Sequence, residues 1–498
     1  MTNLANNLRA AVDTCPDRTA FRHGPAAFTY SEFGQACASA AAWLLARGIT
    51  PGDRIALMLP NGEAFPVLYY AILRVGGIVV PINPLFKSRE IEYYLTDSGA
   101  RLAFVWTEFI AEASRAAAAN GAEVVGIDGS FMALFDSQAG ADPGVAQRND
   151  DDTAVILYTS GTTGNPKGAE LTHGNLRSGA QIFTRGLLNL QDDDVLLGTL
   201  PLFHVFGQTC VMNAAVIARA SVLLVPRFEP LAVLEDIVRH EVTVTLGVPT
   251  MYIAITATDF DETRLRTLRL CACGGAPLPP EVVRAFEARF HLALLQGYGL
   301  SESTACATFS LPGRTRLGSV GHPLEGIDVK IVDATGSELG ADSPGELILR
   351  GAAVMKGYWK RPVETEKTIR DGWLYTGDVA SRDPDGFLYI VDRKKDVIIR
   401  GGYNVYPREV EDVLYEHPSV FEAAVVGVPH PVHGEEVVAV VALKADHVAT
   451  PQELRAFAKE RVAPYKYPRA VLVVDALPHG TTGKILKRDI TVPSELVG

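Results

Sequence analysis

The chain has 498 residues, of which 47% are hydrophobic and 21% are charged, and its formal net charge at pH 7 is −12. This length is too great for one ordinary core, and the composition is that of a globular chain, so we expect two or more domains rather than a disordered protein. The acidic balance argues against nucleic acid or an anionic membrane surface as the main partner. No window of eighteen uninterrupted apolar residues predicts a transmembrane segment, and the scattered cysteines favour a reducing cytoplasm.

The first hundred residues alternate between strand and helix signals. Strands are predicted at residues 28–30, 54–59, 78–82 and 102–106, and helices at residues 31–47, 63–74 and 88–95, with Ser31 as the N-cap of the first helix. Such alternation favours a largely parallel sheet, and therefore an α/β fold. This block carries no residue whose chemistry can be identified.

Residues 158–168, YTSGTTGNPKG, follow an apolar run at 154–157 that is typical of a buried strand. Glycines let backbone N–H groups converge on an anion, and hydroxyls and a lysine add donors, so the stretch predicts a phosphate-binding loop. It is not the P-loop of ordinary NTPases, because Pro166 stands where that motif needs its second glycine. The candidate phosphate ligands are Thr159, Ser160, Gly161, Thr162, Thr163, Gly164 and Lys167.

Further along, residues 244–252 and 271–277 are predicted to be strand ends that break into loops, where ligands of open α/β sheets gather. The pair Cys271 and Cys273 lacks a second pair of metal ligands, so we expect both in the core. A tyrosine between glycines, as Tyr298 is, can stack on a nucleotide base or pack on the core. A lone histidine such as His204 is more often structural than functional.

Residues 318–392 change character, because short β-rich runs alternate with turn clusters. This pattern predicts antiparallel hairpins in a distorted, barrel-like arrangement. Within it, Asp378 of the sequence YTGD could accept from the two hydroxyls of a ribose, although an aspartate after a glycine is also an ordinary turn residue.

The last hundred residues form a small α+β pattern. Helices are predicted at residues 407–416 and from a capping box at 450–453 to about 462, with strands at 420–428 and 436–443. The run Gly401-Gly402-Tyr403 suits the close approach of a narrow ligand. By itself, Lys484 on its glycine-rich turn would be taken for a surface lysine.

These motifs together resemble those of the acyl-adenylate-forming enzymes, which include acyl-CoA synthetases, amino-acid adenylation domains and firefly-type luciferases. Besides the phosphate loop, the sequences LGSVGHP, GWLYTGD, DRKKDVIIRGGYNVYPREVE and LPHGTTGKILK occur in the order of that family. The resemblance covers essentially the whole chain. It implies a large N-terminal domain at residues 1–392, with its β-rich part at about 318–392, and a mobile C-terminal domain at 393–498.

The resemblance also implies roles for individual residues. Lys484 becomes the adenylation lysine, His204 meets the reacting carboxylate or the incoming thiol, Glu302 binds Mg²⁺, and Asp392 is the hinge. The remaining implied sites are the nucleotide site (Gly297, Tyr298, Gly299, Ser301, Asp378, Arg393), the acyl pocket (Phe203, Val248, Gly274, Gly275, Ala276) and the coenzyme A tunnel (Gly401, Gly402, Tyr403).

The reaction implied is a two-step activation of a carboxylic acid with ATP, Mg²⁺ and coenzyme A. The acid forms acyl-AMP and pyrophosphate, and a thiol then takes the acyl group and releases AMP. Segments 203–213, 248–252 and 274–276 contain no lysine or arginine, so a dicarboxylate is disfavoured, because a buried carboxylate without a partner is costly. A medium- or long-chain fatty acid is favoured over an aryl acid, and the lack of an aspartate near His204 disfavours an amino acid.

Other functions remain open on the sequence. A ligase that loads an acyl carrier protein would share the first step, and an aryl-acid CoA ligase would share both. A phosphotransferase would release ADP instead of AMP. A nucleotide-binding module without activity would have no reason to keep Lys484, Asp378 and Glu302 together.

Overall fold

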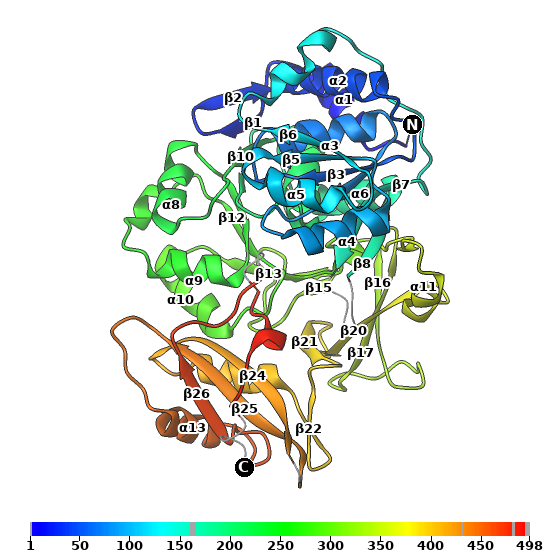
Figure 1. Ribbon diagram of the computed structural model, residues 1–498. Coiled ribbons are helices and arrows are strands. Elements are labelled where there is room, and N and C mark those ends of the chain that lie inside the picture. The colour runs from blue at the N-terminus through cyan, green and yellow to red at the C-terminus, as the bar shows by residue number, and fades with distance from the viewer. Residues whose placement is uncertain (1, 160–165, 431, 481–483, 494–498) are drawn as a thin grey trace.

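The computed structural model of the chain describes residues 2–159, 166–430, 432–480 and 484–493. Figure 1 shows a large N-terminal part of sheets and helices and a smaller unit at the C-terminal end that lies below it. The predicted fold class is confirmed, because the N-terminal part is α/β and the small unit combines a sheet with two helices. No helix in the described ranges is long and apolar enough to span a membrane.

Two large sheets, mostly parallel, form the N-terminal part. One has the order β18 (Gly357–Tyr358), β8 (Lys167–Thr172), β7 (Thr153–Thr159), β4 (Ile78–Pro81), β3 (Arg54–Met58), β5 (Leu102–Trp106), β6 (Glu123–Ile127). The other has the order β15 (His322–Pro323), β14 (Thr308–Phe309), β13 (Leu294–Tyr298), β12 (Leu270–Cys273), β11 (Val244–Gly247), β9 (Val195–Gly198), β10 (Ser221–Leu224), β1 (Thr19–His23), β2 (Ala26–Thr29). Both sheets contribute to one continuous hydrophobic core.

Helices cover these sheets. They are α1 (Ala5–Thr14), α2 (Tyr30–Ala46), α3 (Ala64–Arg74), α4 (Ser88–Ser98), α5 (Ile110–Ala117), α6 (His173–Gln181), α7 (Ala214–Ala218), α8 (Pro230–Arg239), α9 (Pro249–Ala257), α10 (Pro280–Phe290) and α11 (Pro362–Thr368). Two π-helical segments, Ile182–Leu187 and Gly207–Asn213, continue α6 and precede α7. Helix α2 begins one residue before the predicted start, because Thr29 rather than Ser31 caps it and forms a capping box with Glu32.

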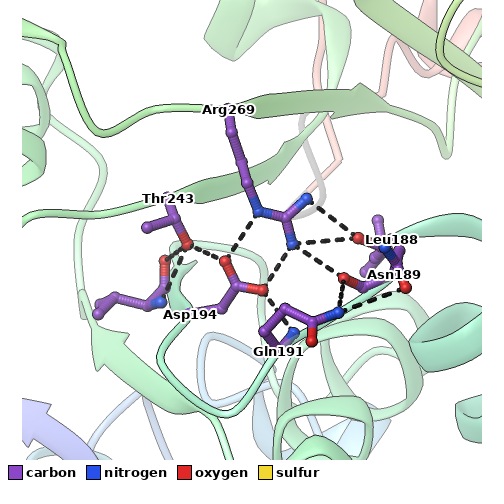
Figure 2. A network of polar contacts seen from close by, with 7 residues as sticks. Leu188, Asn189, Gln191, Asp194, Thr243 and Arg269 are labelled. Carbon is purple, nitrogen blue, oxygen red and sulfur yellow. Dashed lines mark hydrogen bonds and ion pairs between the residues drawn. The ribbon is translucent and has the colours of Figure 1, made fainter.

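An ion pair between a buried aspartate and an exposed arginine joins the starts of three neighbouring strands in the nine-stranded sheet (Figure 2). Asp194 precedes β9, Thr243 precedes β11 and Arg269 precedes β12. Arg269 donates to Asp194 at 2.5 and 2.9 Å, and the Thr243 hydroxyl donates to the same carboxylate at 2.6 Å. Burial opposes the charge on Asp194, but these donors outweigh it and hold the pKa of Asp194 below its usual value. The network fixes the amino ends of the strands, so the loops at their carboxyl ends project from a rigid base.

The β-rich region pairs antiparallel, as the sequence predicts. Its order is β16 (Ile327–Val332), β17 (Gly345–Gly351), β20 (Trp373–Arg382), β19 (Ile369–Arg370), and β21 (Leu388–Arg393) also pairs with β20. Over the described residues, the end strands β16 and β19 do not pair with each other, so the sheet stays open where a barrel-like closure was expected.

The C-terminal unit has a core of its own. Its sheet has the order β23 (Tyr403–Val405), β22 (Ile398–Arg400), β25 (Gly434–Leu443), β24 (Val420–His430), with β26 (Ala470–Val474) parallel to β25. Helices α12 (Pro407–Tyr415) and α13 (Pro451–Lys459) cover it, and Thr450 caps α13 through the predicted capping box. Its hydrophobic cluster is drawn from residues between Ile398 and Val473.

Candidate active site

The candidate site lies at the carboxyl ends of β7, β11, β12 and β13, where ligands of parallel sheets are held. Strand β7 ends at Thr159 and β13 at Tyr298, and the Thr159 hydroxyl contacts Glu302, which follows β13. The side chains of the site come from separate stretches of the sequence, which the fold brings together here.

Glu302 lies in the short helix Ser301–Ser303 after β13 and contacts one end of the phosphate loop directly and the other through Tyr358. Its Oε1 accepts from the Thr159 hydroxyl at 3.3 Å and from the Tyr358 hydroxyl at 2.9 Å. The Lys167 ammonium lies over the Tyr358 ring, 5.3 Å from its centroid. Five of the predicted phosphate ligands lie outside the described residues: Ser160, Gly161, Thr162, Thr163 and Gly164.

Asp378 lies at the bend of β20 and is 3% exposed. It accepts a hydrogen bond from the Tyr298 hydroxyl, and its Oδ1 is 3.2 Å from Nε of Arg393, its neighbour across the strand pair. Burial raises the pKa of Asp378, while Arg393, the Tyr298 hydroxyl and Lys484 oppose that rise. A carboxylate, an aromatic ring and a guanidinium thus meet in one place, which suits a nucleoside phosphate.

Lys484 reaches this group from the C-terminal unit. A Cβ atom at Gly275 would lie 3.9 Å from its Cε, so the lysine side chain passes within van der Waals contact of that strand end. Burial and Arg393 lower the pKa of Lys484 to about 8, whereas Asp378 and Glu302 oppose the lowering. The ammonium therefore lies within electrostatic reach of two carboxylates and remains charged at neutral pH.

His204 lies near this lysine and precedes Phe206, whose ring lies close to Gly274. Burial and the nearby Lys484 charge lower the pKa of His204 to about 3, so its imidazole is neutral at pH 7. Its Nδ1 accepts from the backbone N–H of Phe206 at 3.3 Å, which leaves Nε2 to carry the proton. The ring can therefore donate a hydrogen bond from Nε2.

The predicted acyl-pocket residues gather near the same strand ends. A Cβ atom at Gly274 would lie 3.3 Å from the Phe206 ring, and one at Gly275 would lie 3.6 Å from Val248. Phe203 packs against the main core, and Ala276 is half-buried. The surface so formed is apolar.

Packing within the protein explains two predicted nucleotide-site glycines. A Cβ atom at Gly297 would lie 2.0 Å from the Phe309 ring, and one at Gly299 would lie 2.1 Å from the Ala305 carbonyl oxygen. Ser301 begins the short helix that carries Glu302. Gly297 and Gly299 are therefore required by the fold, whatever they contribute to a nucleotide.

Gly401, Gly402 and Tyr403 do not join the site. The two glycines have φ of +57° and +85° in the turn between β22 and β23, and Tyr403 is 60% exposed and stacks on Tyr465. Figure 1 shows β22 at the lower end of the C-terminal unit, away from the N-terminal sheets.

Asp392 lies between the two parts, where its carboxylate accepts from the backbone N–H groups of Arg393 at 2.7 Å and Arg408 at 3.0 Å.

Several supporting residues were not predicted. Tyr93 and Asp97 on α4 hold the two stems of the phosphate loop, because Tyr93 donates to the Pro166 carbonyl at 2.7 Å and Tyr158 donates to Asp97 at 2.6 Å. Arg361 bridges Asp97 and the Tyr93 hydroxyl at 3.2 and 3.3 Å. Tyr93, Asp97, Arg361 and Tyr358 do not belong to a recognised motif, so no local signal in the sequence could have identified them.

Comparison with known proteins agrees with this geometry. The family profile described as "AMP-binding enzyme" matches residues 8–359, and the one described as "AMP-binding enzyme C-terminal domain" matches residues 409–484. A long-chain-fatty-acid–CoA ligase of Bacillus subtilis (strain 168) is 37% identical over 95% of this chain and 91% of its own. A feruloyl-CoA synthase of Amycolatopsis sp is 38% identical over 95% of this chain and 96% of its own.

Among solved structures, ATP-bound MatB from Rhodopseudomonas palustris superposes with a TM-score of 0.92 at 34% identity, covering 98% of this chain and 97% of that one. The apo form of MatB, with the same identity and coverage, gives a TM-score of 0.81. Because the sequence is the same in both comparisons, the difference reflects conformation.

Proposed function

The chain belongs to the family of AMP-binding enzymes and is an AMP-forming acid–CoA ligase, and within that family we propose that it activates a medium- or long-chain fatty acid. Its substrates are ATP, coenzyme A and a small carboxylic acid, and it works through an acyl-adenylate. The observation that carries the proposal is that Lys484 lies near both Glu302 and Asp378. The apolar residues around Gly274 and Gly275 lie beside these three charged groups.

In the first step, an oxygen of the substrate carboxylate attacks the α-phosphorus of ATP. The bond from that phosphorus to the bridging oxygen breaks, pyrophosphate leaves and acyl-AMP forms. Lys484 offsets the negative charge that develops between the two reactants, and positioned charges of this kind contribute most when they are fixed in advance. Asp378 accepts from the ribose hydroxyls, Tyr298 lies along the base, and Arg393 lies beside them.

A divalent cation fits the donors at the phosphate loop. Glu302 offers a carboxylate and Thr159 a hydroxyl, and oxygen ligands of this kind combined with substrate phosphates are typical of Mg²⁺. Bound there, Mg²⁺ would neutralise the charge of the leaving pyrophosphate. Glu302 and the ends of the loop orient that leaving group.

In the second step, the thiol of coenzyme A attacks the acyl carbon and AMP leaves. We propose that the turn at Gly401 and Gly402 admits the pantetheine arm after the C-terminal unit turns about Asp392. The neutral imidazole of His204 donates from Nε2 to the oxygen of the acyl group in both steps.

The fatty acid is supported by two observations. Segments 203–213, 248–252 and 274–276 contain no lysine or arginine that could hold a second carboxylate, and a Bacillus subtilis relative is named for long-chain fatty acids. An aryl acid is the second candidate, because a relative of equal similarity is named for feruloyl-CoA.

A panel of acids would test the proposal. AMP formation with coenzyme A should be fastest with octanoate to palmitate and slower with benzoate, ferulate, malonate and amino acids. A fixed ATP concentration and separate measurement of AMP and ADP would exclude a phosphotransferase. Preference for ferulate would overturn the fatty-acid proposal, and activity with a phosphopantetheinyl carrier protein but not with coenzyme A would identify a carrier-loading ligase.

A further inference from the structure

Two backbone hydrogen bonds join residues 478–480 to Lys484 and to the segment that follows it. The backbone N–H of Gly480 donates to the Lys484 carbonyl at 2.7 Å, and that of Leu486 donates to the Pro478 carbonyl at 2.8 Å. Between these bonds, His479 pairs with Ile485 as an antiparallel bridge. The position of the Lys484 backbone therefore depends directly on the position of residues 478–480.

Residues 478–480 are tied to the sheet of the C-terminal unit by one ion pair. His479 Nε2 lies 2.9 Å from Glu422 Oε1 on β24, with side chains that are 30% and 5% exposed respectively. Burial raises the pKa of Glu422, and the hydrogen bond with His479 opposes that rise. Below the pair, Ile485 and Ile490 pack with Ala424 and Val440, so the segment after Lys484 is also held against β24 and β25.

We propose that His479 and Glu422 are positioning residues, which set the reach of Lys484 into the nucleotide site during adenylation. The inference rests on the proposed role of Lys484. The lysine must cross from its own unit to Asp378 and Glu302, and a displacement of about 1 Å in a reacting group can cost on the order of 100-fold in rate. The contact between His479 and Glu422 should restrict such displacement of the Lys484 backbone.

The pair acts through the backbone and not through its own charge. The groups that shift the pKa of Lys484 are Arg393, Asp378 and Glu302, together with burial, and neither His479 nor Glu422 is among them. Loss of the ion pair should consequently leave the charge of Lys484 unchanged and alter only its placement.

The test compares His479→Gln, Glu422→Gln and His479→Arg in two assays on the same preparation. Acid-dependent exchange of pyrophosphate into ATP follows adenylation, and thioester formation from supplied acyl-AMP follows the second step. The two glutamine variants should lose about 10- to 100-fold in the kcat of exchange, with little change in the KM for ATP, and keep the second step. The His479→Arg variant should recover most of the exchange, because a guanidinium can donate to the same carboxylate.

A matched control removes another ion pair of the C-terminal unit. Glu409 accepts from Lys466 at 2.7 Å with both oxygens and is 43% exposed. The Glu409→Gln variant should leave exchange unaltered. The double variant His479→Gln/Glu422→Gln avoids an unpaired buried carboxylate, so it should fold even if His479→Gln is unstable, and it should show the same step-specific loss.

Lys484→Ala, measured in parallel, separates the proposed role of Lys484 in adenylation from the positioning role of His479 and Glu422. If this variant keeps exchange, the proposed role of Lys484 fails. If it loses exchange while the His479 and Glu422 variants, including the double variant, keep it, the positioning inference is wrong and the proposed function stands. Equal loss of both half-reactions in the double variant would also overturn the inference, because the pair would then support folding only.

Discussion

Lys484 is the residue whose charge should control the first step. Its pKa of about 8 lies close to working pH, because burial and Arg393 lower it while Asp378 and Glu302 oppose the change. The ammonium is present below that pKa and is lost as pH rises through it. We expect kcat/KM for ATP in pyrophosphate exchange to fall about tenfold for each pH unit above about 8, since this parameter reports the free enzyme.

Two controls belong to this prediction. Bound ATP adds negative charge beside the ammonium, so the corresponding fall in kcat should lie at higher pH. Lys484→Arg should lower the rate but abolish the alkaline fall, because a guanidinium stays charged. Lys484→Ala should cost on the order of 10²- to 10³-fold in exchange and spare thioester formation from acyl-AMP. An alkaline fall that persists in Lys484→Arg would show that another group titrates.

Asp378 should control ATP binding rather than the choice of acid. Its carboxylate is almost completely buried and contacts the Tyr298 hydroxyl and Arg393. These contacts fix the orientation of the carboxylate. Asp378→Ala should raise the KM for ATP by roughly 10- to 100-fold, as the loss of hydrogen bonds to a charged group implies. The order of preference among acids should not change. An altered acid preference with an unchanged KM for ATP would contradict the ribose assignment.

At this scale the sequence predicted which residues carry chemistry but not how they meet. Motif residues such as Asp378 and Lys484 were identified through the family resemblance. Their mutual contacts depend on the topology of three sheets, as does the hydrogen bond from Tyr358 to Glu302. Gly297 and Gly299 were assigned to the nucleotide, whereas Phe309 and Ala305 already leave no room for a side chain there.

At the scale of elements, periodicity predicted most helices and strands to within a few residues. Strand β5 and the capping box at Thr450 lie where the sequence placed them. Both π-helical segments were missed, because an extra residue in a helical turn leaves no signal in the hydrophobic pattern. The open β-rich sheet was expected to be barrel-like, since pairing between distant strands cannot be judged from their separate patterns.

The turn between β22 and β23 gives the prediction that belongs to this scale. Gly402 has φ of +85°, and no atom lies within 4 Å of a Cβ built there, so a side chain would be strained but not crowded. Gly402→Leu should form little acyl-CoA yet exchange pyrophosphate normally, because a branched side chain would fill the proposed passage of pantetheine. Acyl-AMP should accumulate on the enzyme.

Gly402→Asn is the matched variant, since asparagine adopts positive φ more readily than leucine. If the passage is what matters, Asn should also impair thioester formation, with a melting temperature close to that of the unmodified enzyme. If only the turn matters, Asn should be nearly normal, and Leu should lower both half-reactions and the melting temperature together. Measuring both variants distinguishes a tunnel from a turn.

At the scale of the whole molecule, the C-terminal unit stands in an arrangement that suits the proposed first half-reaction. Lys484 lies near Asp378 and Glu302, the proposed ribose and Mg²⁺ ligands, whereas β22, which precedes the Gly402 turn, lies at the lower end of the unit (Figure 1). The TM-score of 0.92 with ATP-bound MatB, against 0.81 with its apo form, agrees with an arrangement of this kind. The sequence could suggest a boundary at Asp392 but not this arrangement, which depends on contacts between two separately folded cores. The boundary itself stays a prediction.

Arg408 is a further side chain that crosses the proposed boundary, and it should favour the adenylating arrangement. Arg408 on α12 is 7% exposed and donates to the Ile390 carbonyl on β21 at 2.7 Å. Ile390 precedes Asp392 and Arg408 follows it, so turning the C-terminal unit about Asp392 should break or strain this bond. A hydrogen bond from a charged group contributes about 1.5–3 kcal/mol, which is enough to shift an equilibrium between two arrangements by about tenfold or more.

Arg408→Met should therefore slow pyrophosphate exchange by about 3- to 30-fold and leave thioester formation from supplied acyl-AMP unchanged or faster. Arg461→Met is the matched control, because Arg461 also donates to a backbone carbonyl, that of Phe457 at 3.0 Å, but within the C-terminal unit alone.

Burial raises the pKa of Asp412 to about 6, and Arg408 opposes that rise. The Arg408→Met substitution is therefore best repeated in an Asp412→Asn background. In that background position 412 carries no charge, so the loss of Arg408 does not leave an unpaired carboxylate there. If both half-reactions still fall equally in that background, Arg408 supports the stability of α12 rather than the placement of the unit, and the adenylating arrangement must be held by other contacts.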